Sequence, residues 1–152
     1  MSKLILLVED NASDEKLTLL ALKKSEASNE VFVVRDGAEA LDFLFGTRDH
    51  AGRGATNLPA LVLLDLKLPK ISGVEVLRRI RADARTSALP VVILTSSKQD
   101  EDVAQGYASG ANAYVRKPVA YAEFLAAAKA IGAFWLSLNE VPRASPAERT
   151  EG

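Results

Sequence analysis

Three short, unbroken apolar runs constrain the fold of this chain more than any other feature. They cover residues 4–8, 61–64 and 91–94 and consist of leucine, isoleucine and valine alone. A half-exposed strand alternates apolar and polar residues, whereas an unbroken apolar run of this length is typical of a strand buried on both faces. Such strands belong mostly to parallel sheets, because crossover connections place helices on both sides. The runs therefore predict a parallel sheet inside an α/β domain.

Two weaker strands and five helical patterns complete this architecture. The strands are expected at residues 31–34 and 113–115, and apolar residues at helical spacing predict helices at residues 15–24, 37–45, 74–81, 100–109 and 119–138. Strict alternation of strand and helix predicts a doubly wound, five-stranded parallel sheet flanked by five helices. We expect the flavodoxin-like strand order 2-1-3-4-5, with a ligand site at the carboxyl ends of the first and third strands.

The chain length fits one such domain. The 152 residues are close to the usual size of a single domain, which we expect to cover residues 1–141. Residues 142–152 contain two prolines and alternating charges, so we expect a disordered tail. Residues 46–59 lack periodicity and are expected to form a long polar loop.

Composition narrows the possible chemistry and partners. The chain has no cysteine and one histidine, His50, which excludes disulfides and thiolate sites and argues against histidine triads and multi-histidine metal sites. A net charge of -1 provides no basic surface for nucleic acid. No apolar run is long enough for a membrane span, and we expect a cytoplasmic protein without nucleic-acid or membrane partners.

Polar residues follow four of the predicted strands at the point where each strand ends. They are Glu9 and Asp10 after the first strand, Asp65 after the third, Thr95 after the fourth and Lys117 after the fifth. Because parallel strands place their carboxyl ends at one edge of a sheet, we expect these side chains to lie together.

The acidic residues favour a metal-assisted phosphoryl chemistry. No glycine-rich turn follows the first strand, so a bare phosphate would meet carboxylates rather than backbone N–H groups. Clustered carboxylates suit Mg²⁺, which then allows a phosphoryl group to approach. Asp65 is the candidate nucleophile toward phosphorus, and Lys117 and Thr95 are candidates for stabilising the oxygens of the transferred group.

Each of these residues also has an ordinary structural interpretation. An acid at a strand end is often a solvated loop residue or a helix cap, and Thr95 with the two serines after it fits a capping pattern. Lys117 alone is typical of a surface lysine, and Tyr114 is either a buried strand aromatic or an exposed one. The convergence on four strand ends is what favours a functional site.

Taken in order and spacing, the motifs of residues 3–138 resemble a response-regulator receiver domain, the phosphoacceptor part of two-component signalling. The matching motifs are Glu9-Asp10, the run from Leu64 to Pro69 that leads to Gly73, Thr95-Ser96, and the run from Tyr114 to Pro118. The resemblance implies that Asp65 receives a phosphoryl group from a histidine kinase. It also implies a stand-alone switch rather than an enzyme, with only self-catalysed phosphotransfer and autodephosphorylation.

The resemblance assigns roles to individual residues. Glu9, Asp10 and Asp65, with the carbonyl of Lys67, are expected to bind Mg²⁺. Thr95 and Tyr114 match the switch pair, Lys117 matches the phosphoryl-binding lysine, and the Lys117–Pro118 bond is expected to be cis.

A finer resemblance links the chain to stand-alone receivers that are paired with bacterial phytochrome histidine kinases. One departure is Lys67, where that subgroup often has asparagine. Only a short tail follows the receiver, so we expect the output to pass to an unknown downstream protein.

The last helix carries more apolar residues than one sheet face needs. Phe124, Ala128, Ile131, Trp135 and Leu138 form one stripe, and Tyr121, Leu125, Gly132 and Leu136 form a second at an angle to it. The second stripe predicts a homodimer through the fifth strand and fifth helix. A broad core stripe with tolerated surface leucines is the alternative.

Two other functions compete with the signalling switch. A haloacid-dehalogenase-like phosphatase also uses an aspartate nucleophile and Mg²⁺, but it needs a second acid two residues later, where this chain has Lys67. A phosphorylation-independent interaction domain would keep the fold, although the complete acid set argues against it.

Overall fold

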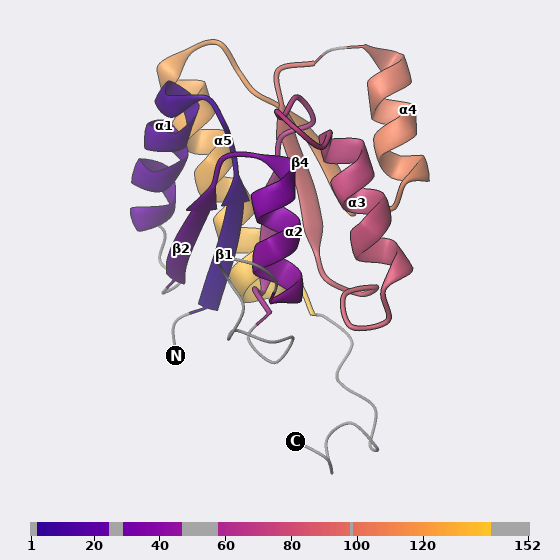
Figure 1. The fold of residues 1–152 in the computed structure, drawn as a ribbon. Helices are drawn as coiled ribbons and strands as arrows, with labels where there is room; N and C mark the ends of the chain where they lie inside the picture. The colour runs from indigo at the N-terminus through magenta and orange to yellow at the C-terminus, as the bar shows by residue number, and fades with distance from the viewer. Residues whose placement is uncertain (1–2, 25–28, 47–57, 98, 141–152) are drawn as a thin grey trace.

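The computed structural model describes residues 3–24, 29–46, 58–97 and 99–140. The strands form one parallel sheet in the order β2-β1-β3-β4-β5, which confirms the predicted fold class. Helices cover both faces of this sheet (Figure 1). The strands are β1 (Lys3–Val8), β2 (Asn29–Val34), β3 (Leu61–Leu64), β4 (Val91–Thr95) and β5 (Ala113–Arg116).

The five predicted helices are present, with small changes at their ends. They are α1 (Ala12–Lys23), α2 (Gly37–Phe45), α3 (Gly73–Ala82), α4 (Asp100–Ala108) and α5 (Tyr121–Ala133). The first begins three residues earlier than its apolar pattern predicts, because the side chain of Asn11 caps it by accepting a hydrogen bond from the N–H of Asp14.

The central strands bury side chains on both faces, as the unbroken apolar runs predict. Leu6 and Leu64 belong to a core with residues of α2 and α3, whereas Leu7 and Leu63 belong to a second core with residues of α1 and α5. Two hydrophobic layers therefore hold the sheet rigidly, and its carboxyl edge is free to carry polar groups.

The end of the last helix differs from the prediction. After α5, residues Phe134–Leu138 form a π-helical turn, η3, closed by a 2.8 Å hydrogen bond from the N–H of Asn139 to the carbonyl of Phe134. A π turn contains more residues than an α turn, so it changes which residues face the sheet. Leu136 is therefore buried at 2% exposure, whereas Leu138, expected in the core stripe, is 73% exposed.

The burial of one residue of α5 and of one residue of the π turn corrects part of the predicted interface. Gly132 and Leu136 are both buried within the protomer, so their assignment to an outward stripe is wrong. Tyr121 is 57% exposed and Leu125 is half-buried, so only these two keep an outward position.

The expected cis peptide bond is also wrong. The bond between Lys117 and Pro118 is trans, which is the lower-energy isomer of an X–Pro bond by about 0.5–1 kcal/mol. Most of the predicted loop at residues 46–59 and the predicted tail at residues 142–152 lie outside the described residues. Within the described ranges, no helix combines the length and the apolar character that crossing a membrane requires.

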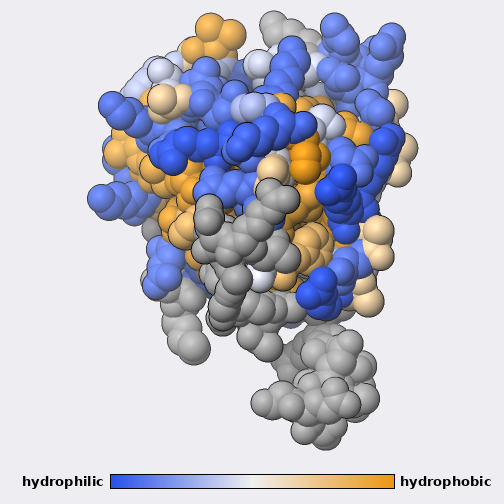
Figure 2. Space-filling model, in the orientation of Figure 1, coloured by the Kyte–Doolittle hydropathy of each residue, from blue (hydrophilic) through white to orange (hydrophobic). Residues whose placement is uncertain are grey.

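The polar end of the molecule is visible on its surface. On the face drawn in Figure 2, hydrophilic side chains cover much of the upper part, toward which the β1 and β2 arrows point in Figure 1. The carboxyl edge of the sheet is therefore the polar end of this face.

Candidate functional site

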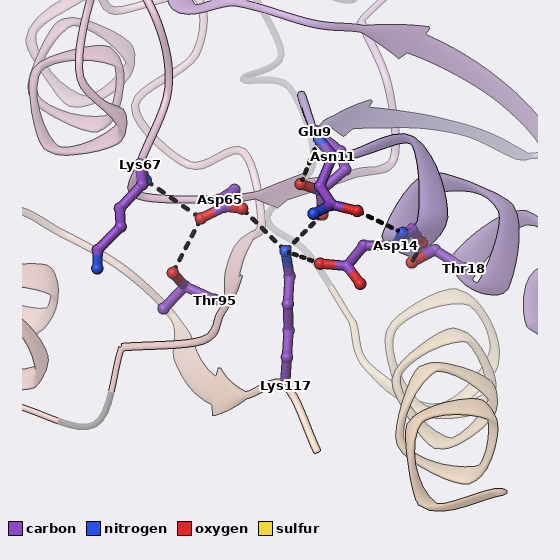
Figure 3. A network of polar contacts seen from close by, with 8 residues as sticks. All are labelled: Glu9, Asn11, Asp14, Thr18, Asp65, Lys67, Thr95 and Lys117. Atoms are coloured by element: carbon purple, nitrogen blue, oxygen red, sulfur yellow. Dashed lines mark hydrogen bonds and ion pairs between the residues drawn. The ribbon is translucent and has the colours of Figure 1, made fainter. Parts of the chain in front are cut away.

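The structure brings four of the predicted strand-end residues into direct contact. The Lys117 Nζ atom lies 2.7 Å from Glu9 Oε1 and 2.8 Å from Asp65 Oδ2, and Thr95 Oγ1 donates a 2.9 Å hydrogen bond to Asp65 Oδ1 (Figure 3). The parallel register of β1 and β3 brings Asp65 beside Glu9. In this register, the N–H of Asp65 donates a 3.1 Å hydrogen bond to the carbonyl of Val8.

Asp65 is held by three donors at the end of β3. Its Oδ1 atom accepts from Thr95 and, at 3.1 Å, from the backbone N–H of Lys67, while its Oδ2 atom accepts from Lys117. Burial works against the charged form, but the hydrogen bond and charge of Lys117 outweigh it and lower the pKa of Asp65. Asp65 is therefore an oriented, ionised carboxylate at neutral pH.

Lys117 is the buried cation of the site. Its side chain is 5% exposed, and its ammonium group contacts Asp14 Oδ2 at 2.9 Å in addition to Glu9 and Asp65. Burial would lower the pKa of Lys117, but the hydrogen bonds to Asp65, Glu9 and Asp14 raise it overall. The ammonium group thus stays charged across the physiological range.

Asp14 is the site residue that the sequence reasoning missed. It lies in the first turn of α1, whereas the acids predicted from the sequence lie at strand ends. The sequence signal for Asp14 is Asn11, a residue typical of a helix cap, three positions earlier. A cap directly after β1 places the first turn of α1, and with it Asp14, at the carboxyl edge of the sheet.

Glu9 carries the unfavourable charge of the site. It is 1% exposed. Burial raises the pKa of Glu9 to about 7, although the hydrogen bond and charge of Lys117 act in the opposite direction. The charge of nearby Asp65 also raises this pKa, by less than burial does, and the acids at this edge leave negative charge in excess of the single ammonium group.

That excess has a geometry suited to a second cation. Carboxylate oxygens of Glu9, Asp10 and Asp65 lie within 4.8 Å of one another, and Asp10 is exposed. Three carboxylates, those of Glu9, Asp14 and Asp65, contact the single ammonium group of Lys117, and Asp10 adds a fourth negative charge at the same edge of the sheet. Lys67 contributes its backbone N–H to Asp65, while its side chain extends away from the site (Figure 3).

A close backbone contact supports the loop after β3. A Cβ atom at Gly73 would lie 2.3 Å from the carbonyl oxygen of Asp65, so only glycine allows α3 to begin this near to it. This contact explains why the sequence motif that contains Asp65 continues to Gly73.

The hydroxyl groups after β4 have separate partners. Thr95 bonds Asp65, whereas the hydroxyl of Ser97 contacts the carboxylate of Asp102 and accepts from the N–H of Gln99 at 3.4 Å. The cap residue of α4, Gln99, makes no side-chain capping bond. The capping alternative therefore does not describe Thr95.

Tyr114 combines the two positions that the sequence left open. It is half-buried against the core on the α2 and α3 face, and its hydroxyl donates a 3.4 Å hydrogen bond to the carbonyl of Ser97. Burial raises the pKa of Tyr114. The ring thus lies beside the β4–α4 loop that follows Thr95.

Known proteins are similar to this chain in sequence and in fold. Rcp1, a response regulator of Synechocystis sp., is 37% identical over 144 residues, which cover 93% of this chain and 95% of Rcp1. Its Mn²⁺-bound crystal structure matches with a TM-score of 0.86 at 35% identity, covering 93% of this chain and 99% of that one.

Two solved phytochrome-associated regulators are also similar. The phosphorylated cyanobacterial phytochrome response regulator RcpA has a TM-score of 0.87 and 38% identity, covering 94% of this chain and all (100%) of its own. The bacteriophytochrome response regulator RtBRR has a TM-score of 0.74 and 50% identity, covering 99% and 90% of the two chains.

The family comparison agrees with the geometry at the carboxyl edge of the sheet. Residues 5–129 match the family described as the response regulator receiver domain. The family match covers most of β1, all of β2 to β5 and the residues that meet at Asp65. The chain therefore belongs to the response regulator receiver domain family.

Proposed function

We propose that Asp65 is the phosphoacceptor of this response regulator and that its phosphorylation by a histidine kinase is the signal. The supporting observation is a buried, ionised carboxylate whose two oxygens are oriented by Thr95, Lys67 and Lys117. A carboxylate oxygen of Asp65 attacks the phosphorus of phosphohistidine, the P–N bond breaks, and the histidine leaves with the electron pair. The product is an aspartyl phosphate.

The neighbouring side chains support this transfer by charge and hydrogen bonding. Lys117 has an ammonium group within 2.8 Å of Asp65, from which it can donate to a phosphoryl oxygen. Thr95 donates its hydroxyl to the other oxygen of Asp65 and can turn it toward the transferred group. These donors are preorganised by burial, so they stabilise developing charge without first shedding water.

The acid cluster fits a divalent cation, and we assign it to Mg²⁺. Carboxylates of Glu9, Asp10 and Asp65, with the carbonyl of Lys67, are the proposed ligands, because hard oxygen donors are what Mg²⁺ prefers. The Mn²⁺-bound form of the relative Rcp1 supports a divalent ion here. When bound, such an ion neutralises the negative charge that would otherwise repel a phosphoryl group.

The proposed readout is a rearrangement of Thr95 and Tyr114. The hydroxyl of Thr95 leaves Asp65 for the phosphoryl group, and the Tyr114 ring follows beside the β4–α4 loop, where it already contacts Ser97. A local chemical mark thereby alters the surface around α4 and β5.

The partners follow from the relatives. Similarity to RcpA and RtBRR supports a bacteriophytochrome histidine kinase as the phosphoryl donor. We further propose a cytoplasmic location and an unknown protein that receives the signal. We also propose self-association through the β5 edge and the part of α5 that contains Tyr121 and Leu125. Sedimentation that shows a monomer with and without a phosphoryl analogue would remove the dimer.

Intact mass measurement tests the proposed acceptor. With Mg²⁺ and acetyl phosphate, the wild type is expected to gain one phosphoryl group and Asp65→Asn none. Asp100→Asn, which makes the same chemical change on the exposed start of α4, is the control and should behave as wild type. An unmodified wild type, or equal labelling of Asp65→Asn, would refute the proposal, and multiple turnover of organic phosphates would favour the phosphatase alternative.

A further inference from the structure

Asp14 differs from the other carboxylates of the site. Its Oδ2 atom lies 2.9 Å from Lys117 Nζ, but it is not one of the acids whose oxygens lie close enough together to share a metal. Among the described residues, that group contains Glu9, Asp10 and Asp65. Asp14 therefore contacts the ammonium group without belonging to the proposed metal site.

The backbone around Asp14 is fixed on both sides. Its N–H donates to Asn11 Oδ1 at 3.0 Å, and its carbonyl accepts from Thr18 Oγ1 at 2.8 Å (Figure 3). The N–H of Asn11 in turn donates to Glu9 Oε2 at 3.3 Å. The first turn of α1 is thus tied to the site, and the carboxylate of Asp14 is presented from a rigid support.

The hydrogen bonds of Lys117 are fully used before phosphorylation. An ammonium group has three N–H donors, and Glu9, Asp14 and Asp65 provide one acceptor each. Under the proposed function, Asp65 becomes an acyl phosphate, and Glu9 would be a ligand of the metal ion. Of these three partners, Asp14 alone undergoes neither change.

We propose that Asp14 is a positioning residue, an inference that rests on the proposed function. Asp14 holds the Lys117 ammonium group in place while the N–H that bonds Asp65 is redirected to a phosphoryl oxygen. Without Asp14, the ammonium group loses the one partner that stays the same before and after transfer. Phosphorylation should then slow even when the metal site is saturated.

A neighbouring acid provides a matched control. Glu15 lies in the same helical turn, and its carboxylate pairs with Arg35 at 3.0 Å. Asp14→Asn and Glu15→Gln therefore remove the same charge from the same end of α1, and both weaken the favourable interaction of an acid with the helix N-terminus. A general charge or stability effect would appear in both variants.

The test is the rate of phosphorylation by acetyl phosphate at saturating Mg²⁺. A carboxylate oxygen of Asp65 attacks phosphorus, the P–O bond to the acetyl group breaks, and acetate leaves. Asparagine keeps an oxygen acceptor but loses the charge, and replacing this charge-assisted hydrogen bond to Lys117 by a neutral one is expected to slow Asp14→Asn roughly 5- to 20-fold. Glu15→Gln should stay within about two-fold of the wild type, which corresponds to a small surface-charge effect.

Two further measurements separate positioning from folding. In a Lys117→Met background, Asp14→Asn should cause no additional slowing, because Asp14 acts through Lys117. In wild-type protein, the ¹⁵N–¹H signal of the Lys117 ammonium group should be protected from solvent exchange, and Asp14→Asn should weaken that protection while Glu15→Gln should not.

The outcomes distinguish the two proposals. Wild type that cannot be phosphorylated overturns the function itself and this inference with it. If the wild type is phosphorylated but Asp14→Asn is no slower than Glu15→Gln, the role of Asp14 alone is overturned. The role of Asp14 is also overturned if Asp14→Asn slows phosphorylation equally in the wild-type and Lys117→Met backgrounds.

Discussion

A buried cation and a half-buried one lie at opposite ends of the parallel strands and are stabilised in different ways. Lys117, at the carboxyl edge, contacts the carboxylates of Glu9, Asp14 and Asp65. Arg81, near the end of α3, is bound at the amino ends of β4 and β5 by neutral oxygens. Its acceptors in the described part of the chain are the carbonyls of Thr86, Ser87, Leu89 and Gly110 and the side chain of Asn112.

The charge of the acceptors distinguishes the structural site at Arg81 from the reactive site at Lys117. The Arg81 acceptors carry no charge, so the cluster is complete and has little to offer another ion. The Arg81 side chain also lies against Gly110, where a Cβ atom would come within 2.6 Å of Arg81 Cγ and 2.9 Å of Arg81 Nε. Around Lys117 the acids outnumber the cation, which leaves negative charge that a metal ion or a proton can neutralise.

Removing either cation should cause the largest change in stability. In the absence of metal at pH 8, Lys117→Met is expected to lose about 3–5 kcal/mol of unfolding free energy, because buried carboxylates are left unpaired. Arg81→Met should lose about 2–4 kcal/mol through unpaired carbonyls. Urea unfolding measures both.

The decisive part is rescue by a divalent ion. Millimolar Mg²⁺ should restore part of the stability of Lys117→Met, since carboxylates bind it, and should leave Arg81→Met unchanged. Equal rescue of both variants, or of neither, would show that the two clusters do not differ as described.

The pH dependence of stability tests the excess charge at Glu9. Its folded pKa of about 7 lies above the usual 4.5, so the folded state binds the proton more tightly than the unfolded state does. The resulting stability is fully present below about pH 4.5 and is lost as the pH rises through 7, a change of up to about 3 kcal/mol.

Glu9→Gln isolates that contribution. Glutamine keeps an oxygen acceptor for Lys117 but does not titrate. Without metal, the unfolding free energy of Glu9→Gln should therefore increase relative to that of the wild type as the pH rises from 5 to 8. A difference that is constant over this range would contradict the assigned pKa.

Asn112 is the side-chain acceptor among the neutral oxygens that bind Arg81. Its Oδ1 atom accepts from Arg81 at 2.9 Å and from the N–H of Val91 at 2.8 Å. Asn112→Ala should cost about 1–3 kcal/mol by leaving both donors unpaired, with no change in the rate of phosphorylation of folded protein. Asn112→Asp keeps the acceptor and should retain most of the stability in urea unfolding.

Thr95 provides the smallest expected change in stability. Thr95→Val preserves its shape but removes the hydroxyl bonded to Asp65. We expect a loss of about 1 kcal/mol and a rise in the pKa of Asp65, followed by the ¹³C carboxyl signal during an acid titration. Thr95→Ser, which retains the hydroxyl, should keep the pKa of Asp65 near its wild-type value.

The sheet and its polar edge follow from the sequence because they depend on local patterns. An unbroken apolar run reports burial on both faces directly, so the predicted strand at residues 61–64 coincides with β3 (Leu61–Leu64). Parallel strands also end at a common edge, so the meeting of Asp65 with Glu9, Thr95 and Lys117 needs only the strand order.

Other features depend on contacts that the local pattern does not encode. The π turn at Phe134–Leu138 reverses the expected exposure of Leu136 and Leu138, yet its residues are compatible with a continued α-helix. Arg81 binds carbonyl groups, which every residue possesses, so its partners leave no mark in the sequence.

Chemical localisation of the phosphoryl group is the most direct test of whether Asp65 is the phosphoacceptor. Wild-type protein is treated with acetyl phosphate and Mg²⁺ and then reduced with borohydride, which converts an aspartyl phosphate to homoserine. Peptide mass spectrometry should find homoserine at position 65 and unmodified aspartate at positions 10 and 14. Homoserine at another acid, with position 65 unchanged, would contradict the assignment of Asp65 as the phosphoacceptor.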